Sequence, residues 1–310
     1  MDYLMSEAER TTLDLLEFIR QSPSPFHCVA QSAKELDTYN FKRLSEGDNW
    51  KLEEGGSYYV IRDGALVACR SGAKPAAEAG VRGLVALTDS PNLRIKPQAD
   101  VAEKGYAQLG VEVYGGVLTY TWLDRDLGLA GKVTMSGEDK PSTISSQLVW
   151  IDKPILRIPS LAIHLNREYR SEGIKLNNQN HMTPILGLVD DTSNQNALKI
   201  LLGKELGVHP DRILSWELSL ADVVPPCLGG TNNEFIFSPR LDNQAMCHAS
   251  ITALTQTLSA TLSTPPDATS VVCLYDHEEV GSGSATGAGG SITEDILYRV
   301  AEVEGPGATT

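Results

Sequence analysis

The sequence predicts an α/β protein in which a β-rich module interrupts the α/β part of the chain. Three observations favour this fold class: apolar residues at helical spacing near the N-terminus, short apolar strands on both sides of the middle, and strand-like segments separated by Gly, Asp and Pro in between. The 310 residues are enough for two domains, and the 41% of hydrophobic residues can form a core. We expect an α/β domain over residues 1–98 and 235–310, with the inserted module over residues 99–234.

Two helices are expected at the start of the chain. Residues 6–20 carry leucine and isoleucine at helical spacing, with acidic residues early and Arg20 last, as the helix dipole favours. The Ser-Pro-Ser-Pro motif at residues 22–25 ends this helix, because proline lacks the amide hydrogen that a helix interior needs. A second amphipathic helix is expected over residues 29–39.

Strands follow these helices. The Asp63-Gly64 pair between the apolar runs 58–62 and 65–70 predicts a β-hairpin, since these residues suit a tight turn. Residues 81–87 are mostly apolar and predict a buried strand. The polar residues 88–91 come directly after it, at the end of a strand where ligands bind in open α/β sheets.

The central part of the chain is dominated by strand-like segments, which predict the β-rich module. They lie at residues 111–122, 131–135, 147–151 and 218–220. One helix, expected over residues 196–206 and ended by Gly207, interrupts them.

The α/β pattern returns after residue 235. We expect a helix over residues 241–258, an apolar strand over 269–275 that ends in the polar turn 276–279, and a helix over 293–300. The glycine-rich run 281–290 lacks the Lys-Ser or Lys-Thr ending of a phosphate-binding loop and follows two carboxylates. Nucleotide binding is therefore not expected there.

Composition excludes several classes of partner. The net charge of −14 repels phosphate backbones and anionic membrane surfaces, so neither a nucleic acid nor a membrane is expected as partner. No apolar run has transmembrane length and the N-terminus is acidic, which predicts a soluble, cytoplasmic protein. The scattered cysteines contain no Cys-x-x-Cys pair and are expected to be small buried hydrophobic residues rather than disulfide partners: Cys28, Cys69, Cys227, Cys247 and Cys273.

Three acidic spots are candidates for chemistry because each lies where a strand gives way to a turn or a helix. They are Asp89, Asp242 and the adjacent pair Glu278 and Glu279. Adjacent carboxylates repel each other, so such a pair at a strand end suggests a cation or a buried partner. The alternative is a solvated acidic turn, since the whole chain is rich in acidic residues. The six histidines contain no His-x-x-x-His pair, which excludes a zincin-type site.

Six sequence motifs, considered together and in their order along the chain, indicate one protein family far more specifically than the spacing of the acidic residues does. They are SPSPFH at 22–27, TDSPNLRIKP at 88–97, GVEVYGG at 110–116, IPSLAIHLNR at 158–167, NNEFIFSPRLDN at 232–243 and DHEEVGS at 276–282. Together they resemble the aspartyl aminopeptidase family over nearly the whole chain. The resemblance implies an α/β/α zinc-peptidase catalytic domain interrupted by a β-rich dimerisation domain. It also implies a homo-oligomer with two zinc ions per site that releases N-terminal Asp or Glu from peptides.

The resemblance also implies a role for each matched residue. Asp242 matches the carboxylate that bridges both zinc ions, Glu279 matches a ligand of one zinc, and Glu278 matches the general base. Asp89 matches the residue that orients a zinc-binding histidine two positions earlier. His164 matches a residue that contacts either metal or substrate; we favour the substrate, because His164 lies within the inserted module.

The chain departs from the family pattern in two places. Leu87 stands where the family has the zinc-binding histidine, and leucine carries no donor atom. The family continues for more than a hundred residues beyond the equivalent of Thr310, with two further metal ligands, so we expect this chain to be truncated at its C-terminus. Asp242 and Glu279 alone fall short of the three protein ligands that a catalytic zinc usually has.

Two functions follow from these departures. The first is a zinc aminopeptidase by descent, which binds zinc weakly and has little or no activity as this chain alone. The alternative is a non-catalytic assembly or regulatory subunit that docks on a complete homologue. Leu87 favours the alternative, because a shorter chain does not by itself require the loss of that histidine.

Overall fold

The computed structural model describes residues 6–138, 140–189, 196–256 and 266–304. The chain divides into two compact units: unit 1 comprises Met1–Ser90 and Pro226–Thr310, and unit 2 comprises Pro91–Pro225. Within these described ranges, no helix combines the length and the hydrophobicity needed to cross a membrane.

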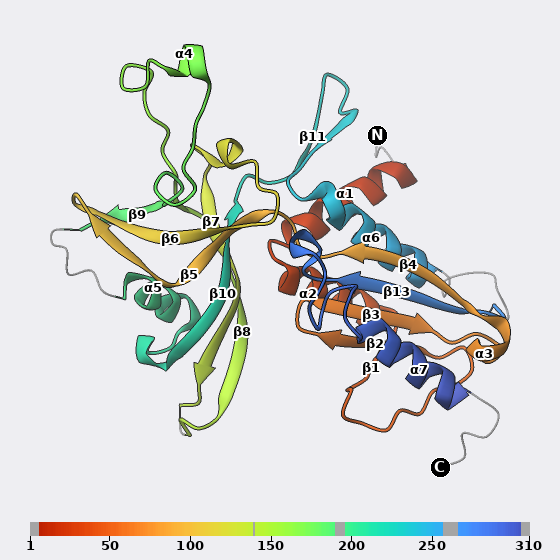
Figure 1. The fold of residues 1–310 in the computed structure, drawn as a ribbon. Helices are drawn as coiled ribbons and strands as arrows, with labels where there is room; N and C mark the ends of the chain where they lie inside the picture. The colour runs from red at the N-terminus through yellow and green to blue at the C-terminus, as the bar shows by residue number, and fades with distance from the viewer. Residues whose placement is uncertain (1–5, 139, 190–195, 257–265, 305–310) are drawn as a thin grey trace, which may run out of the picture. The chain divides into compact units, whose positions relative to one another are not determined.

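Unit 1 is built on a five-stranded mixed sheet (Figure 1), in which the interior strand β13 pairs antiparallel with β3 and parallel with β4. In spatial order the strands are β1 (Lys42–Arg43), β2 (Ser57–Arg62), β3 (Ala65–Arg70), β13 (Thr269–Tyr275) and β4 (Val81–Leu87). The expected hairpin is confirmed as β2 and β3, with Asp63 at a φ of 50° in the turn. The strand expected over residues 269–275 is confirmed as β13.

Helices cover both faces of this sheet, which confirms the α/β/α class. On one face lie α1 (Glu7–Arg20), α2 (Pro25–Thr38) and α6 (Leu241–Gln256), whose apolar side chains form one core cluster with the sheet. On the other face, α7 (Ile292–Glu304) packs against a second cluster. Tyr58 and Tyr59 belong to different clusters because neighbouring side chains on a strand point to opposite faces. A short helix, α3 (Ala76–Ala79), precedes β4.

The helix boundaries follow from local chemistry. Ser6 and Glu9 form a capping box at the start of α1, where the expected helix is confirmed. Helix α2 begins at Pro25, four residues before the expected start, because Ser24 occupies the N-cap and proline is tolerated in the first turn. The helix expected over residues 241–258 is confirmed as α6 up to Gln256, and residues 257–258 lie outside the described residues.

Strand β4 forms as expected, but the prediction that it is buried is wrong. Val81, Leu84 and Val85 are 42%, 45% and 61% exposed. The strand lies at the edge of the sheet, so within the described residues no further strand pairs with its outer side. Its apolar composition is typical of a strand that is covered on both faces.

Unit 2 contains a six-stranded antiparallel sheet, which agrees with the β-rich character expected for the middle of the chain. In spatial order its strands are β8 (Ile144–Leu156), β7 (Leu127–Ser136), β10 (Ile213–Asp222), β5 (Asn92–Glu103), β6 (Tyr106–Tyr114) and β9 (Ile185–Leu188). The helix expected over 196–206 is confirmed as α5 (Ala197–Leu206), and Gly207 ends it at a φ of 68°. Leu198 and Leu202 of α5 join the core of the sheet.

Short elements complete the two units. Unit 2 also contains η1 (Thr119–Trp122), α4 (Tyr169–Glu172) and η2 (Pro210–Arg212), and unit 1 contains η3 (Glu278–Val280). Strands β11 (Cys227–Gly229) and β12 (Phe235–Phe237) pair as a separate hairpin in unit 1. Four cysteines are buried as expected, but Cys227 is exposed, because a two-stranded hairpin has no second layer to cover it.

Candidate active site

The centre of the candidate site is the turn formed by Thr88, Asp89 and Ser90, here called the 88–90 turn. It directly follows β4, and the segment with Glu278 and Glu279 directly follows β13. Because β4 and β13 are parallel neighbours, their carboxyl ends meet at the same edge of the sheet. This topology brings together acidic residues that are about 190 positions apart in the sequence.

Asp89 links the two strand ends directly. Its side chain is 0% exposed, and one oxygen accepts a hydrogen bond from the backbone N–H of Glu278 while the other accepts one from Glu279, both at 3.2 Å. Glu278 itself is exposed and Glu279 is half-buried. A buried carboxylate therefore fixes the backbone from which two more accessible carboxylates extend.

Asp242 joins the site from the first turn of α6. The Ser90 hydroxyl donates to the backbone oxygen of Asp242 at 3.3 Å, and the Leu87 N–H donates to Asn243 Oδ1 at 3.3 Å. The thiol of Cys247, one turn further along α6, donates to the Leu87 carbonyl at 3.0 Å. Residues 87–90 thus contact the backbone of Asp242, Glu278 and Glu279.

The glycine-rich run folds against the Glu278–Glu279 segment instead of forming an independent loop. The Asp276 N–H donates to the Thr286 carbonyl at 3.1 Å, and His277 Nδ1 lies 2.8 Å from Ser284 Oγ. At Gly287 a side chain would meet the Ser282 carbonyl at 2.3 Å, so only glycine allows the chain to pass this closely. The run therefore supports the acidic turn.

The Ser-Pro-Ser-Pro-Phe-His motif lies beside the segment that leads into Asp242, a role that the sequence did not indicate. Gln244 donates to the Ser22 carbonyl at 2.6 Å, and Arg240 donates to the Ile19 carbonyl at 3.1 Å. Burial, together with the positive charge of Arg240, lowers the pKa of His27 from 6.5 to about 4. The motif itself does not reveal this partner, because Gln244 lies more than 200 residues away in the sequence.

The residues present do not complete a zinc site. Leu87 offers no donor, and no group of three His, Cys, Asp or Glu side chains in the described ranges has an arrangement that could hold a metal ion. Asp242 and Glu279 remain as two candidate ligands, whereas a catalytic zinc usually has three from the protein. The carboxylates alone can accept protons and attract cations.

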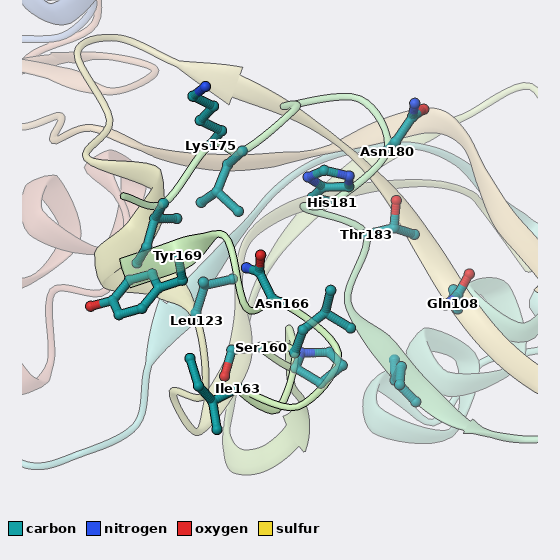
Figure 2. A pocket seen from close by; sticks show the side chains of 15 residues that line it. Gln108, Leu123, Ser160, Ile163, Asn166, Tyr169, Lys175, Asn180, His181 and Thr183 are labelled. Atoms are coloured by element: carbon teal, nitrogen blue, oxygen red, sulfur yellow. The ribbon is translucent and has the colours of Figure 1, made fainter. Parts of the chain in front are cut away.

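His164 lies in unit 2, on the long excursion between β8 and β9, and its side chain is exposed. The same excursion borders a cavity of about 650 Å³ (Figure 2). Asn166 and His181 are among its polar lining residues, with Leu161, Ile163 and Tyr169 among the apolar and aromatic ones. His164 is not one of the residues that line this cavity.

Comparison with known proteins decides the family. A family model described as aminopeptidase I zinc metalloprotease (M18) matches residues 18–308. The chain belongs to the M18 family. It is 43% identical over 290 residues to a probable M18 family aminopeptidase 2 of Pseudomonas syringae pv. tomato, covering 92% of this chain and 65% of that protein. The corresponding protein of Streptomyces avermitilis is 41% identical over 290 residues, and the match covers 93% of this chain and 64% of that protein. The chain therefore spans about 65% of the length of such M18 relatives.

Solved M18 structures agree in fold. A chain from a cryo-EM structure of the Ape4 and Nbr1 complex matches with a TM-score of 0.91 and 36% identity, and the match covers 99% of this chain and 62% of that one. Yeast aminopeptidase 1 (Ape1) matches with a TM-score of 0.83 and 30% identity, covering 96% and 69%. A chain of the S. cerevisiae mApe1 dodecamer also matches with a TM-score of 0.83, at 31% identity, and the match covers 96% of this chain and 67% of that one. The family resemblance and the fold class drawn from the sequence are thus confirmed, whereas the roles of the individual M18 site residues stay predictions.

Proposed function

We propose that this chain carries the carboxylate part of an M18 aminopeptidase centre that releases acidic residues from the N-termini of peptides. Glu278 acts as the general base that takes a proton from the attacking water, and Asp242 and Glu279 are metal ligands. The single observation that carries this proposal is the buried Asp89, which links the Glu278–Glu279 backbone to the end of β4. Such a junction of parallel strand ends is a usual place for an active site in α/β proteins.

The same proposal includes low activity for the chain alone, because the described residues offer too few metal ligands. The test combines native mass spectrometry in zinc-containing buffer with hydrolysis of peptides that begin with Asp, Glu or Ala. We expect less than one zinc per chain and little hydrolysis. Rapid release of Asp and Glu, lost in Glu278→Gln, would contradict the low activity but support the assigned chemistry. Rapid hydrolysis that Glu278→Gln leaves unchanged would contradict the role of Glu278.

The inserted unit supplies assembly and a substrate contact in this proposal. M18 neighbours of known structure include a dodecamer, which supports a homo-oligomer formed through unit 2. The exposed His164 then contacts the substrate rather than a metal. Light scattering of the purified chain measures the oligomer, and a monomer at micromolar concentration would contradict this part. The cytoplasmic location inferred from the sequence stays a prediction.

The second candidate is a non-catalytic assembly subunit, which Leu87 favours. Leu87→His restores a ring nitrogen at the position where the family pattern has a zinc-binding histidine. We expect this variant to bind zinc more tightly by at least about tenfold, or ~1.4 kcal/mol. The matched control is Leu87→Gln, which is polar but a poor zinc ligand, and titration calorimetry measures both. Unchanged zinc affinity in Leu87→His would contradict the assigned ligand position. Co-purification with a longer M18 homologue, together with no hydrolysis in either form, would favour the assembly subunit.

A further inference from the structure

Residue 87, two positions before Asp89, is a leucine where the family pattern has a histidine. A side chain two positions earlier on an extended strand points to the same side, so a histidine at position 87 could meet the Asp89 carboxylate. This chain has Leu87 there, which offers no hydrogen-bond donor from its side chain. The Leu87 side chain therefore cannot take up the orienting role that the resemblance implies for Asp89.

Asp89 is nevertheless one of the most deeply buried charged residues of unit 1, with 0% of its surface exposed. A carboxylate is costly to bury unless hydrogen bonds replace its lost hydration. The two backbone N–H groups of Glu278 and Glu279 supply such bonds, one to each oxygen, at 3.2 Å.

We infer that Asp89 is a positioning residue that acts through the backbone amides of Glu278 and Glu279, independently of any histidine at position 87. Two consecutive amides held by one carboxylate fix the path of the backbone at the point where both side chains leave it. This inference deepens the proposed function and rests on it only for the roles of Glu278 and Glu279.

The 88–90 turn extends this positioning to the third acidic residue. The neighbouring Ser90 hydroxyl donates to the Asp242 carbonyl at 3.3 Å, so adjacent residues of one turn contact both the Glu278–Glu279 segment and α6. The turn is itself anchored, because the Thr88 hydroxyl donates to the Gly64 carbonyl at 2.7 Å and to the Tyr275 carbonyl at 3.0 Å. The segment after β4 therefore contacts the backbone from which all three acidic side chains extend.

The test is hydrogen exchange of individual backbone amides, measured by NMR in the full chain. Asp89→Asn has the same shape but loses the charge and replaces one acceptor oxygen with a donor group. We expect the Glu278 or Glu279 amide to exchange at least tenfold faster. The Asp276 amide, which donates to the Thr286 carbonyl at 3.1 Å, should change less than threefold.

Thr88→Val is the matched control, since it removes two hydrogen bonds from the same turn without touching the acceptor of the glutamate amides. It should accelerate the exchange of the Glu278 and Glu279 amides less than Asp89→Asn does, because the Asp89 side chain that accepts from them is still present. Equal exchange in the wild type and Asp89→Asn, or the same acceleration in Thr88→Val, would overturn the inference. If Asp89→Asn does not fold, amide exchange in the wild-type chain still tests the inference. Glu278 and Glu279 amides that exchange as fast as amides without hydrogen bonds would also overturn the inference.

This readout separates the inference from the proposed function. Amide exchange requires no peptidase activity, so a chain that fails to hydrolyse peptides still tests the positioning by Asp89. Where the wild-type chain does hydrolyse aspartyl peptides, Asp89→Asn should lower kcat at least tenfold and change KM by less than twofold. An unchanged kcat would show that the orientation of Glu278 does not depend on Asp89.

Discussion

The partly buried His27 makes the stability of unit 1 depend on pH. Its side chain touches Ser24 Oγ through Nδ1 at 2.8 Å, and burial with the nearby Arg240 lowers its pKa from 6.5 to about 4. The unfolded chain therefore binds a proton at a higher pH than the folded chain does. The stability that neutral His27 provides is fully present above pH 6.5 and is lost as the pH falls from 6.5 towards 4.

The size of this effect follows from the difference between the two pKa values. A shift of one pKa unit corresponds to about 1.4 kcal/mol, so the full loss is about 3 kcal/mol once the pH is below the folded-state value. Between pH 7 and pH 5 the expected loss is about 2 kcal/mol, because the unfolded chain is already protonated at pH 5 while the folded chain is not.

The measurement compares the wild type with His27→Asn, whose amide reaches the same Ser24 hydroxyl but does not titrate. Urea unfolding at pH 7 and pH 5 would be followed by hydrogen exchange of peptides from α2, which report on unit 1. Carboxylates titrate in both proteins, so their effect cancels when the two proteins are compared. The difference between the pH dependences of the two unfolding free energies therefore measures the contribution of His27. We expect the wild type to lose about 2 kcal/mol more than the variant. Parallel pH dependences in the two proteins would refute the reasoning.

Two further predictions concern packing in each unit. The Arg299 guanidinium lies 3.7 Å from the centre of the Trp50 ring, so Arg299→Ala should lower the stability of unit 1 by about 1–2 kcal/mol in urea unfolding; an unchanged midpoint would contradict this. Gly131 has a φ of 151° and a Cβ there would meet a carbonyl of β10 at 2.0 Å. Gly131→Ala should therefore destabilise unit 2 by more than about 3 kcal/mol in thermal unfolding, and the control Gly187→Ala, which has open space, should not. Equal melting of the two glycine variants would contradict the steric argument.

Local sequence patterns predicted the helices and strands well, because the residues that begin and end these elements are their immediate neighbours in the sequence. The cap at Ser6, the Asp63-Gly64 turn and the positive φ at Gly207 depend on neighbouring residues only. The start of α2 was misplaced because Pro25 was interpreted as ending a helix, whereas Ser24 lets the same proline begin one. A proline near a helix end is ambiguous until the preceding residue is shown to adopt the N-cap conformation.

The exposure of β4 illustrates what local patterns leave open. Val85 and Ala86 are both apolar and adjacent, yet Val85 is 61% exposed and Ala86 is 4% exposed. Composition indicates which residues suit a covered strand, but burial depends on which elements pack beside it. Cys227 shows the same limit, since it is a small hydrophobic residue on a hairpin without a second layer.

The sequence by itself determined the family, the α/β/α class and the acidic residues of the candidate site, because ordered motifs and their residue types are visible without coordinates. It also showed that Leu87 breaks the zinc-ligand pattern. Only the tertiary structure decided what Asp89 contacts, since Asp89 and Glu279 are 190 positions apart and meet through the parallel pairing of β4 with β13. Such pairing depends on the packing of the whole sheet, so no local pattern around Asp89 could reveal that its carboxylate holds the backbone of the two glutamates.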